Sequence, residues 1–288
     1  MTEAERPHAR NLFKGTPIFI WMIILVIIPL SSTLVMSFQS SEGLVIEKEL
    51  TIENYALFVT DSIYPKILLK TILMALGITL LSLVMAYPLA YMISFKMKRA
   101  KDFLFMVSII PLWVSYLVRI IAWRTILGNN GVINSILMRL HIIKEPIELF
   151  LYNPFAIAIT LTAICIPFVF IPVYTALEKI PKNIIDASND LGANELRTFI
   201  NVVFPISLPG VITGSIFAFI ISLGDYIIPQ QLGGTSGIMY GNLIWSQFGF
   251  AFNWPLGAAL GFLLFGIAVL ILTLSSKYGS GGGGVLAE

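Results

Sequence analysis

Residues 154–177 read PFAIAITLTAICIPFVFIPVYTAL and contain no charged side chain. About 20 consecutive apolar residues are needed for a helix to cross the hydrocarbon core of a bilayer. Five further stretches have a similar length and character: 16–38, 67–94, 103–127, 206–224 and 255–275. Several of these stretches contain proline, which bundled membrane helices tolerate because neighbouring groups satisfy the freed carbonyls. The sequence therefore predicts an all-α integral membrane protein with six transmembrane helices.

The composition agrees with a lipid-exposed surface. Of the 288 residues, 57% are hydrophobic and 12% are charged, whereas a soluble domain carries about 25% charged residues. This composition predicts that membrane lipid surrounds the chain. The net charge of +2 gives no support to a nucleic-acid partner. With one cysteine, Cys165, and two distant histidines, His8 and His141, the sequence predicts neither a disulfide nor a metal site.

Lysine and arginine are distributed unequally between the two sides of the predicted bundle. One side carries Arg6, Arg10, Lys14, Lys96, Lys98, Arg99, Lys101, Lys179, Lys182, Arg197 and Lys277. The other side carries Lys48, Lys66, Arg139 and Lys144, and its first loop, 39–65, is acidic. Because cytoplasmic loops are enriched in lysine and arginine, both termini are expected on the cytoplasmic side of a bacterial inner membrane.

The chain divides accordingly into three parts. Residues 1–15 are expected to form a cytoplasmic tail, residues 16–278 the six-helix transmembrane domain with the cytoplasmic connection 178–205, and residues 279–288 a flexible linker or tag remnant. The linker assignment depends on the glycine-rich run at 279–284.

The connection 178–205 is long for a cytoplasmic link and has a helical pattern. Residues 182–191 place Ile184, Ile185, Ser188 and Leu191 near one face. Gly192 stands where a helix ends in a left-handed residue, and Asn194 can cap a second helix over 195–203. Two short helices outside the bilayer need a protein partner to cover their apolar face.

The same connection carries a recognisable motif. It reads Asp186-Ala187-Ser188-Asn189-Asp190-Leu191-Gly192, then nine residues, then Val202-Val203-Phe204-Pro205. This resembles the signature loop of ABC importer permeases, Glu-Ala-Ala, three residues, Gly, nine residues, Ile-x-Leu-Pro, with conservative departures. The resemblance implies a coupling helix that docks into a groove of an ATPase subunit. The residues implied in this contact are Asp186, Ala187, Ser188, Leu191, Gly192, Ala193 and Pro205.

A narrower resemblance covers nearly the whole chain. Its residues are Pro111-Leu112-Trp113, Arg119-Ile120-Ile121-Ala122-Trp123, Asn129-Asn130-Gly131, Pro167-Phe168, Pro172-Val173-Tyr174, Gly224-Asp225-Tyr226, Leu232-Gly233-Gly234 and Asn253-Trp254-Pro255. These segments resemble the B-type permease subunit of bacterial spermidine/putrescine importers. The resemblance implies a type I importer fold that moves putrescine or spermidine by alternating access. It also implies a C-type permease in a heterodimer, two copies of an ATPase, and a periplasmic or lipid-anchored polyamine-binding protein.

The chain contains no Gly-x-x-x-x-Gly-Lys-Ser/Thr loop, so ATP and Mg²⁺ are expected to act on the separate ATPase, and no cofactor is expected in this subunit. No catalytic set is apparent, which predicts that the chain is not an enzyme. Two alternatives stay open: the same architecture carrying an iron complex, an opine or a sugar phosphate, and a membrane enzyme or receptor.

Several residues are candidates for a cation's path. Asp225 is the only carboxylate near the outer end of the fifth span, and an acid at membrane depth is a functional hypothesis by default. Aromatic faces attract ammonium groups, so Tyr226, Trp245 and Trp254 are candidates beside it. Alternatively, Asp225 caps a broken helix and the tryptophans form an interfacial belt.

Two further positions near the path have a structural alternative, and two arginines are not expected to contact the substrate. Gln230 offers an amide oxygen or belongs to a plain loop, and Tyr116 lines the path or packs within the bundle. Arg119 and Arg124 would repel a polycation, so they are expected to reach the headgroups or pair with an acid of a partner chain.

Overall fold

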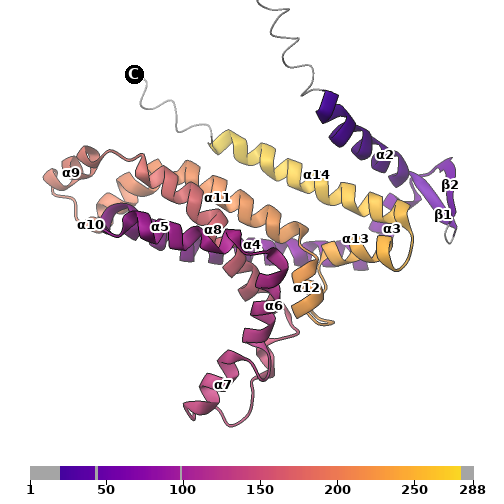
Figure 1. Cartoon of the computed structure of the whole chain (residues 1–288). Coiled ribbons are helices and arrows are strands. Elements are labelled where there is room, and N and C mark those ends of the chain that lie inside the picture. The colour runs from indigo at the N-terminus through magenta and orange to yellow at the C-terminus, as the bar shows by residue number, and fades with distance from the viewer. Residues whose placement is uncertain (1–19, 43–44, 98, 280–288) are drawn as a thin grey trace, which may run out of the picture. The chain divides into compact units, whose positions relative to one another are not determined.

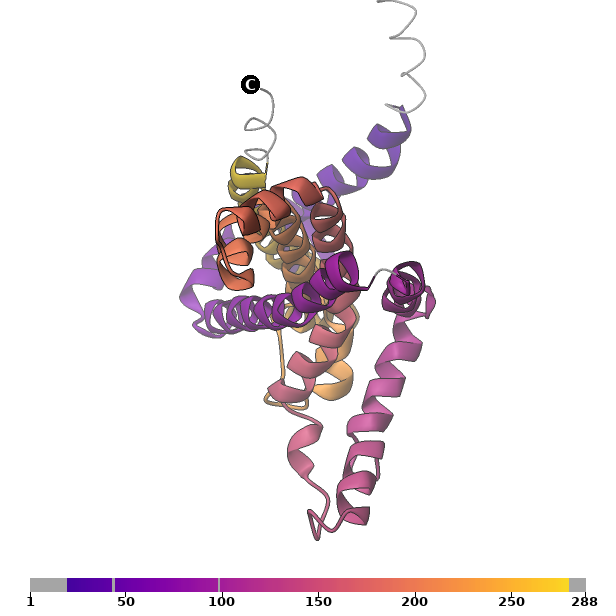
Figure 2. The ribbon, with the colours of Figure 1, turned by 90° about the vertical axis from the view of Figure 1, so that its left-hand side faces the viewer.

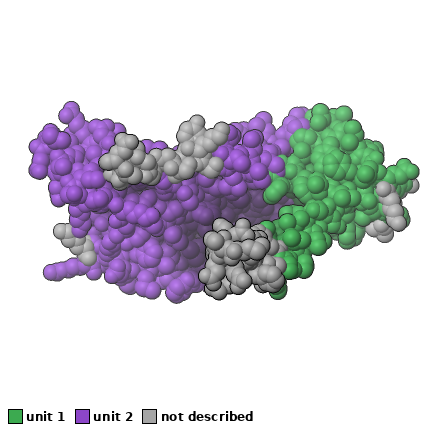
Figure 3. Space-filling view, turned by 90° about the horizontal axis from the view of Figure 1, so that it is seen from above, with its two compact units in different colours: residues 1–62, 244–265 green, residues 63–243, 266–288 purple. Residues whose placement is uncertain are grey.

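The computed structural model describes residues 20–42, 45–97 and 99–279. The predicted tail 1–15 and residues 280–288 of the predicted linker lie outside these ranges, and Gly279 is the last residue of a helix. The chain forms two compact units, coloured separately in Figure 3. The first unit comprises residues 1–62 and 244–265, and the second comprises residues 63–243 and 266–288.

Five helices are long and apolar enough to cross a membrane. They are Ile20–Ser37, Ile63–Lys96, Pro154–Glu178, Glu195–Gly224 and Trp254–Ser275. Each overlaps one of the predicted stretches. The sixth predicted stretch, 103–127, corresponds to a bent pair, Lys101–Trp113 and Tyr116–Arg139, so the described residues hold five spans, or six if the pair is one span.

The core of the second unit is α8 (Pro154–Glu178), packed between α4 (Ile63–Tyr91) and α11 (Phe204–Gly224) (Figure 1). Asn153 caps α8 by accepting hydrogen bonds from the N–H groups of Phe155 and Ala156, and Pro154 occupies the first helical position, where its missing N–H costs nothing. In the most apolar stretch of α8, 61% of the residues are buried within the chain, against 28% in α4. The uncharged stretch is therefore the central helix rather than a lipid-facing one.

The third predicted span is not one straight helix, which corrects the sequence interpretation. It consists of α5 (Lys101–Ile109), a 3-10 turn (Ile110–Trp113) and α6 (Tyr116–Leu127), with a bend of 96° at the break. Pro111 removes a backbone donor from the turn, and Val114 and Ser115 are then extended, with ψ of 134° and 139°. After the bend, α6 and α7 (Val132–Arg139) form an arm that extends away from α8 and α11 (Figure 2).

The first unit adds a small β-hairpin that the all-α prediction did not include. Strand β1 (Gln39–Glu42) pairs antiparallel with β2 (Val45–Leu50), and α3 (Glu53–Thr60) follows. Asn54 of α3 donates from Nδ2 to the carbonyls of Ser37 (3.0 Å) and Gln39 (2.7 Å), which ties the hairpin to the end of α2 (Ile28–Ser37). The acidic segment predicted as a loop is therefore ordered by local pairing.

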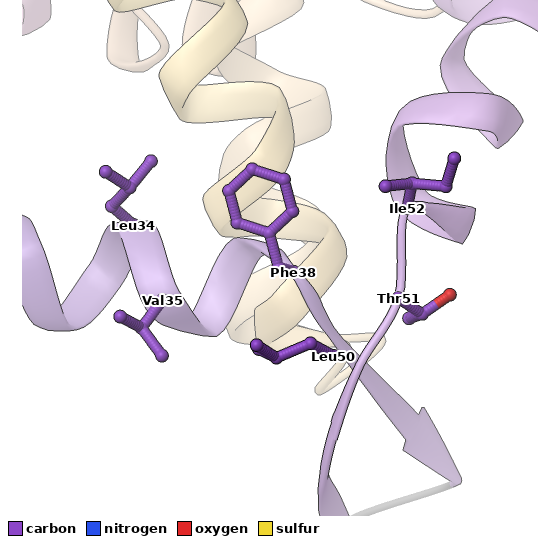
Figure 4. A pocket seen from close by; sticks show the side chains of 6 residues that line it. All are labelled: Leu34, Val35, Phe38, Leu50, Thr51 and Ile52. Atoms are coloured by element: carbon purple, nitrogen blue, oxygen red, sulfur yellow. The ribbon is translucent and has the colours of Figure 1, made fainter.

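An apolar cavity of about 640 Å³ opens beside this hairpin (Figure 4). Its lining residues are Leu34, Val35, Phe38, Leu50, Thr51 and Ile52. Leu50 and Ile52 are both 71% exposed, so the cavity is an open hollow of the first unit rather than an enclosed chamber.

The remaining elements connect these helices. They are π turns at Ile23–Ile27, Met92–Lys96 and Phe199–Val203, a 3-10 turn at Glu148–Phe150, α9 (Lys182–Asp190), α10 (Glu195–Thr198), α12 (Ile227–Leu232), α13 (Tyr240–Gly249) and α14 (Trp254–Gly279).

Candidate functional site

Two interruptions of the apolar helices meet in the second unit. One is the break before α6, which begins at Tyr116, and the other separates α11, which ends at Gly224, from α12, which begins at Ile227. The hydroxyl of Tyr116 donates a hydrogen bond to Oδ2 of Asp225. Two residues that the sequence analysis proposed separately therefore contact each other across 109 positions of the chain. We call this contact and the two breaks the junction.

Asp225 also caps α12. Its Oδ1 accepts from the N–H groups of Ile227 (2.8 Å) and Ile228 (3.2 Å), and the residue is only 8% exposed. An aspartate placed two residues before a helix satisfies donors that the helix itself leaves unpaired. The capping alternative considered for Asp225 is therefore confirmed, and its contact with a substrate stays a prediction.

The start of α13 supports the break between α11 and α12. Asn242 donates from Nδ2 to the carbonyl of Tyr226 at 2.8 Å. A Cβ added at Gly241 would lie 2.9 Å from the carbonyl oxygen of Asp225, so only glycine allows this close approach. Sequence reasoning missed both residues, although a Gly-Asn pair following a helix break is a signal of close backbone packing.

Arg119 lies one helical turn beyond Tyr116 on the same face of α6. Its Cζ atom is 5.6 Å from the centre of the Tyr116 ring, a cation–π contact. Its Nε and Nη1 atoms are buried and have no hydrogen-bond acceptor among the described residues. The residue as a whole is half-buried, so the expectation that Arg119 reaches the headgroups or pairs with an acid of a partner chain stays a prediction.

Arg124 is exposed and forms two contacts within the chain, so its expected reach to the headgroups or to a partner stays a prediction. Its Nη1 donates to Oε1 of Gln231 at 3.2 Å, and its Nη2 donates to the hydroxyl of Tyr152 at 3.5 Å. The Gln231 contact is a second polar link between α6 and α12, in addition to that between Tyr116 and Asp225. Gln230, which the sequence offers together with Gln231 as a source of amide oxygens, is likewise exposed on α12.

The proposed tryptophans belong to the first unit. Trp245 packs its ring edge-on against Phe250 at 4.8 Å, and Trp254 lies 6.4 Å from Phe248. The structure thus brings Tyr116, Asp225 and Tyr226 together in the second unit, and a role of the tryptophans in the path stays a prediction. Among the described residues, no group of three or more His, Cys, Asp or Glu side chains could hold a metal ion.

Residues near the start of α4 hold the loop that connects α12 to α13. Lys70 donates from Nζ to the carbonyls of Ser236 and Ile238 (the latter at 3.0 Å), and the N–H of Tyr240 donates to Oγ1 of Thr71 at 2.8 Å. Lys70 is not among the site residues predicted from the sequence. Its role is to fix the loop that leads from α12 to α13.

The predicted cytoplasmic connection forms a second candidate site, which we call the coupling segment, residues 182–203. Gly192 has a φ of +81°, and the side chain of Asn194 accepts from the N–H of Arg197, so both predicted signals are confirmed. The predicted second helix is not a separate element, because α10 continues through a π turn into α11 as one helical run, Glu195–Gly224. Pro205 does not end this run, because it lies in the first turn of α11, where its missing N–H removes no hydrogen bond.

The two helices of the coupling segment are held together by hydroxyl groups. The side chains of Ser188 and Thr198 form a hydrogen bond of 2.9 Å, and Thr198 also donates to Oδ1 of Asn189 at 3.4 Å. Leu191 does not share the half-buried face of Ile184, Ile185 and Ser188, because α9 ends at Asp190 and leaves Leu191 88% exposed.

Most of the residues implied by the motif face outward. Asp186, Ala187 and Pro205 are exposed and Ala193 is half-buried. Leu196 and Ile200 are also exposed, at 65% and 54%, and Leu196 lines a hollow with Tyr87, Tyr91 and Met92. The exposure of Leu191 at the end of α9 is compatible with the predicted protein contact, which stays a prediction.

Comparison with known proteins identifies the chain. It belongs to the family described as binding-protein-dependent transport system inner membrane component, whose model matches residues 86–278. It is 32% identical over 263 residues to the spermidine/putrescine transport system permease protein PotB of Haemophilus influenzae, covering 91% of this chain and 90% of that protein. It is 37% identical over 240 residues to the inner membrane ABC transporter permease protein YdcU of Escherichia coli, covering 79% and 75%.

A solved structure shows the same fold. A crystal structure of a bacterial ABC transporter involved in the import of the acidic polysaccharide alginate contains a chain with a TM-score of 0.74 and 15% identity, covering 94% of this chain and 96% of that one. At this identity the likeness concerns the fold alone. The chain therefore has the type I ABC permease fold that the motif implied.

These findings confirm the coarse predictions. The chain is a permease subunit of an ABC importer, an inner membrane component of a system that depends on a binding protein. Its relatives are permease subunits, which are not catalytic, so the prediction that this chain is not an enzyme is confirmed as well. The substrate, the remaining subunits and the roles of individual residues are matters for the proposal below.

Proposed function

We propose that this chain is one of two permease subunits of an ATP-driven importer that moves polyamines, putrescine or spermidine, into the cytoplasm. The observation that carries the proposal is the 32% identity to a spermidine/putrescine permease over 91% of the chain. The partners are a C-type permease, two copies of an ATPase that uses ATP and Mg²⁺, and a periplasmic or lipid-anchored polyamine-binding protein.

The junction supplies groups suited to an organic cation. Asp225 is an almost fully buried carboxylate whose three hydrogen bonds come from Tyr116, Ile227 and Ile228. Two of these donors are backbone groups of α12, so the Tyr116 hydroxyl is the partner that an ammonium group can replace. The freed tyrosine ring and that of Tyr226 then offer aromatic faces worth about 0.5–2 kcal/mol each to the cation. Trp245, Trp254 and Gln230 are the further proposed contacts along the path.

The coupling segment transmits the ATPase cycle in this proposal. Exposed Leu191, Asp186 and Ala187 contact a groove of the ATPase, and the left-handed Gly192 sets the angle between α9 and α10. Closure of the ATPase dimer on ATP moves 182–195 and opens the path outward, and hydrolysis returns it. The shift requires that nucleotide binds the closed arrangement more tightly than the open one.

We propose six spans with both termini in the cytoplasm. Two ion pairs of the second unit support a shared side for the helix ends that carry the basic residues. Lys101 at the start of α5 pairs with Glu178 at the end of α8, and Lys96 after α4 pairs with Glu195 at the start of α10 (3.3 Å). If the bent pair crosses the membrane once, the alternation of helix ends places all four residues on the cytoplasmic side.

The proposal is tested by uptake of radiolabelled putrescine and spermidine into proteoliposomes that hold the full assembly. We expect uptake that requires both ATP and Mg²⁺ and that falls at least about tenfold in Asp225→Asn, corresponding to about 1.4 kcal/mol. Asp102→Asn, an exposed carboxylate in the first turn of α5, is the matched control and should keep full uptake.

The outcomes separate the parts of the proposal. Unchanged uptake in Asp225→Asn removes this residue from the path but keeps the substrate. No polyamine uptake by an assembly with active ATPase refutes the substrate, and the same liposomes are then tested with an iron complex, an opine and a sugar phosphate.

A further inference from the structure

Arg119 is the one charged group of the junction that the proposed function does not use. Its Nε and Nη1 atoms are buried, and no described residue accepts a hydrogen bond from them. A buried guanidinium without an acceptor is costly, because the water it loses is not replaced. An arrangement in which these donors find an anionic acceptor would therefore be favoured over the present one at this position.

Asp225 is the carboxylate of the same cluster. Tyr116 contacts both groups, because its hydroxyl donates to Asp225 and the Cζ atom of Arg119 lies 5.6 Å from the centre of its ring. Tyr116 and Arg119 stand three residues apart on α6, so both project from one face of the helix toward α8 and α12. In the present arrangement Tyr116 holds Oδ2 of Asp225, and Arg119 stacks on the Tyr116 ring.

We infer that Tyr116 and Arg119 are alternative partners of Asp225, and that the importer passes between a Tyr116–Asp225 hydrogen bond and an Arg119–Asp225 ion pair. A displacement of α6 along α12 by less than one helical turn exchanges the two partners, because i and i+3 residues are neighbours along the helix axis. Shifts of packed helices between two discrete arrangements are a known form of switching. The chain is interrupted on both sides of this contact, at Val114–Ser115 and at Asp225–Tyr226, so α6 and α12 can move without bending α5 or α11.

A second polar link between α6 and α12 would change together with the exchange of partners at Asp225. Arg124 donates to Gln231 near the far end of α6, and both residues are exposed there. Because this link lies at the surface, water can replace it during the displacement at little cost. The buried exchange at Asp225 therefore sets the preference between the two arrangements.

Arg119 is a positioning residue in this inference, and the test measures the balance between states rather than transport alone. The assembled importer is prepared with Tyr116→Phe and, separately, with Arg119→Gln, both of which keep Asp225. The fraction of assembly trapped by ATP with vanadate is measured in liposomes. Tyr116→Phe removes one arrangement and Arg119→Gln removes the other, so the two variants should shift the trapped fraction in opposite directions, each by about threefold or more. Arg119→Lys, which keeps the positive charge, should lie close to the wild type.

A direct measurement accompanies the trapping. Structures of the wild-type assembly in the nucleotide-free and vanadate-trapped states should show Asp225 bonded to Tyr116 in one and within ion-pair distance of Arg119 in the other. Shifts in the same direction, or no shift, overturn the inference. So does a structure in which an acid of the partner permease holds Arg119 in both states. The inference rests on the proposed ATP-driven cycle but not on polyamine as substrate, so failed polyamine uptake with opposite trapping shifts would refute the substrate alone.

Discussion

The junction and the coupling segment differ in which side chains are buried: the junction buries a charged one, and the coupling segment exposes apolar ones. At the junction, Asp225 is 8% exposed and both of its carboxylate oxygens have partners within the chain. In the coupling segment, Leu191 is 88% exposed and Leu196 is 65% exposed, although both are apolar. At the junction Asp225 is paired within this subunit and, among the described residues there, only two guanidinium nitrogens of Arg119 are not, whereas the coupling segment exposes apolar side chains that we propose the ATPase covers.

This difference indicates where each kind of change acts. Substitutions at the junction remove hydrogen bonds between described residues, so they alter the stability of the subunit itself. Substitutions at exposed positions of the coupling segment leave the internal contacts unchanged, so under the proposed function we expect them to alter association with the ATPase. The predictions below test this separation, beginning with the largest expected effect.

The largest effect is expected for Asp225→Leu. The variant leaves the buried N–H groups of Ile227 and Ile228 and the hydroxyl of Tyr116 without their acceptor, at about 1–3 kcal/mol for each unsatisfied group. Thermal unfolding of the detergent-purified assembly should show a clear loss of stability. Asp225→Asn keeps an amide oxygen for the cap of α12 and should lose less than half as much; equal losses in the two variants would contradict the capping role.

A smaller effect, confined to association, is expected for Leu191→Asp. Burying a leucine side chain in a partner contributes about 1.5–3 kcal/mol, so the affinity for the ATPase should fall about tenfold or more. Copurification of the ATPase with the tagged permease measures this loss. Leu140→Asp is the matched control, because Leu140 also follows the last residue of a helix and is 63% exposed. A comparable loss in both variants would show that the coupling segment has no special contact.

Gly192→Val should weaken coupling through the backbone. No atom lies within 4 Å of an added Cβ at Gly192, so its φ of +81° is the only obstacle. A left-handed conformation costs about 1–2 kcal/mol for a residue with a Cβ. Gly192→Asn should be tolerated, because asparagine adopts this conformation at helix ends. ATPase copurification and uptake should therefore fall in the valine variant alone, and normal uptake there would contradict the need for a left-handed turn.

The smallest effect is expected for Lys96→Ala. Its ion pair with Glu195 joins side chains that are 54% and 87% exposed, and exposed pairs contribute under about 1 kcal/mol. The unfolding temperature and ATPase copurification should both stay close to the wild type. A loss as large as that of Leu191→Asp would mean that this pair positions α10 for the partner.

The sequence predicted elements whose signals are local. Apolar length located four of the spans to within a few residues, whereas the third predicted stretch is a bent pair and the fifth span begins at Glu195 rather than near 206. Gly192 and Asn194 predicted the turn of the coupling segment, because a left-handed residue and an N-cap act within one helical turn. The hairpin 39–50 was missed because its strands are short and follow an apolar span directly.

The junction shows where sequence reasoning ends. Asp225 and Tyr116 were both candidates, but 109 positions separate them in the chain. No local pattern predicts that a bend of 96° after Pro111 brings α6 against α12. Tertiary packing alone decided that Asp225 accepts from Tyr116 and that two guanidinium nitrogens of Arg119 are buried without an acceptor among the described residues. The sequence by itself determined the membrane class, the helices and the coupling turn, since these depend on neighbouring residues. The tertiary structure decided which polar groups meet, because burial and hydrogen bonding depend on helices that are distant in the chain.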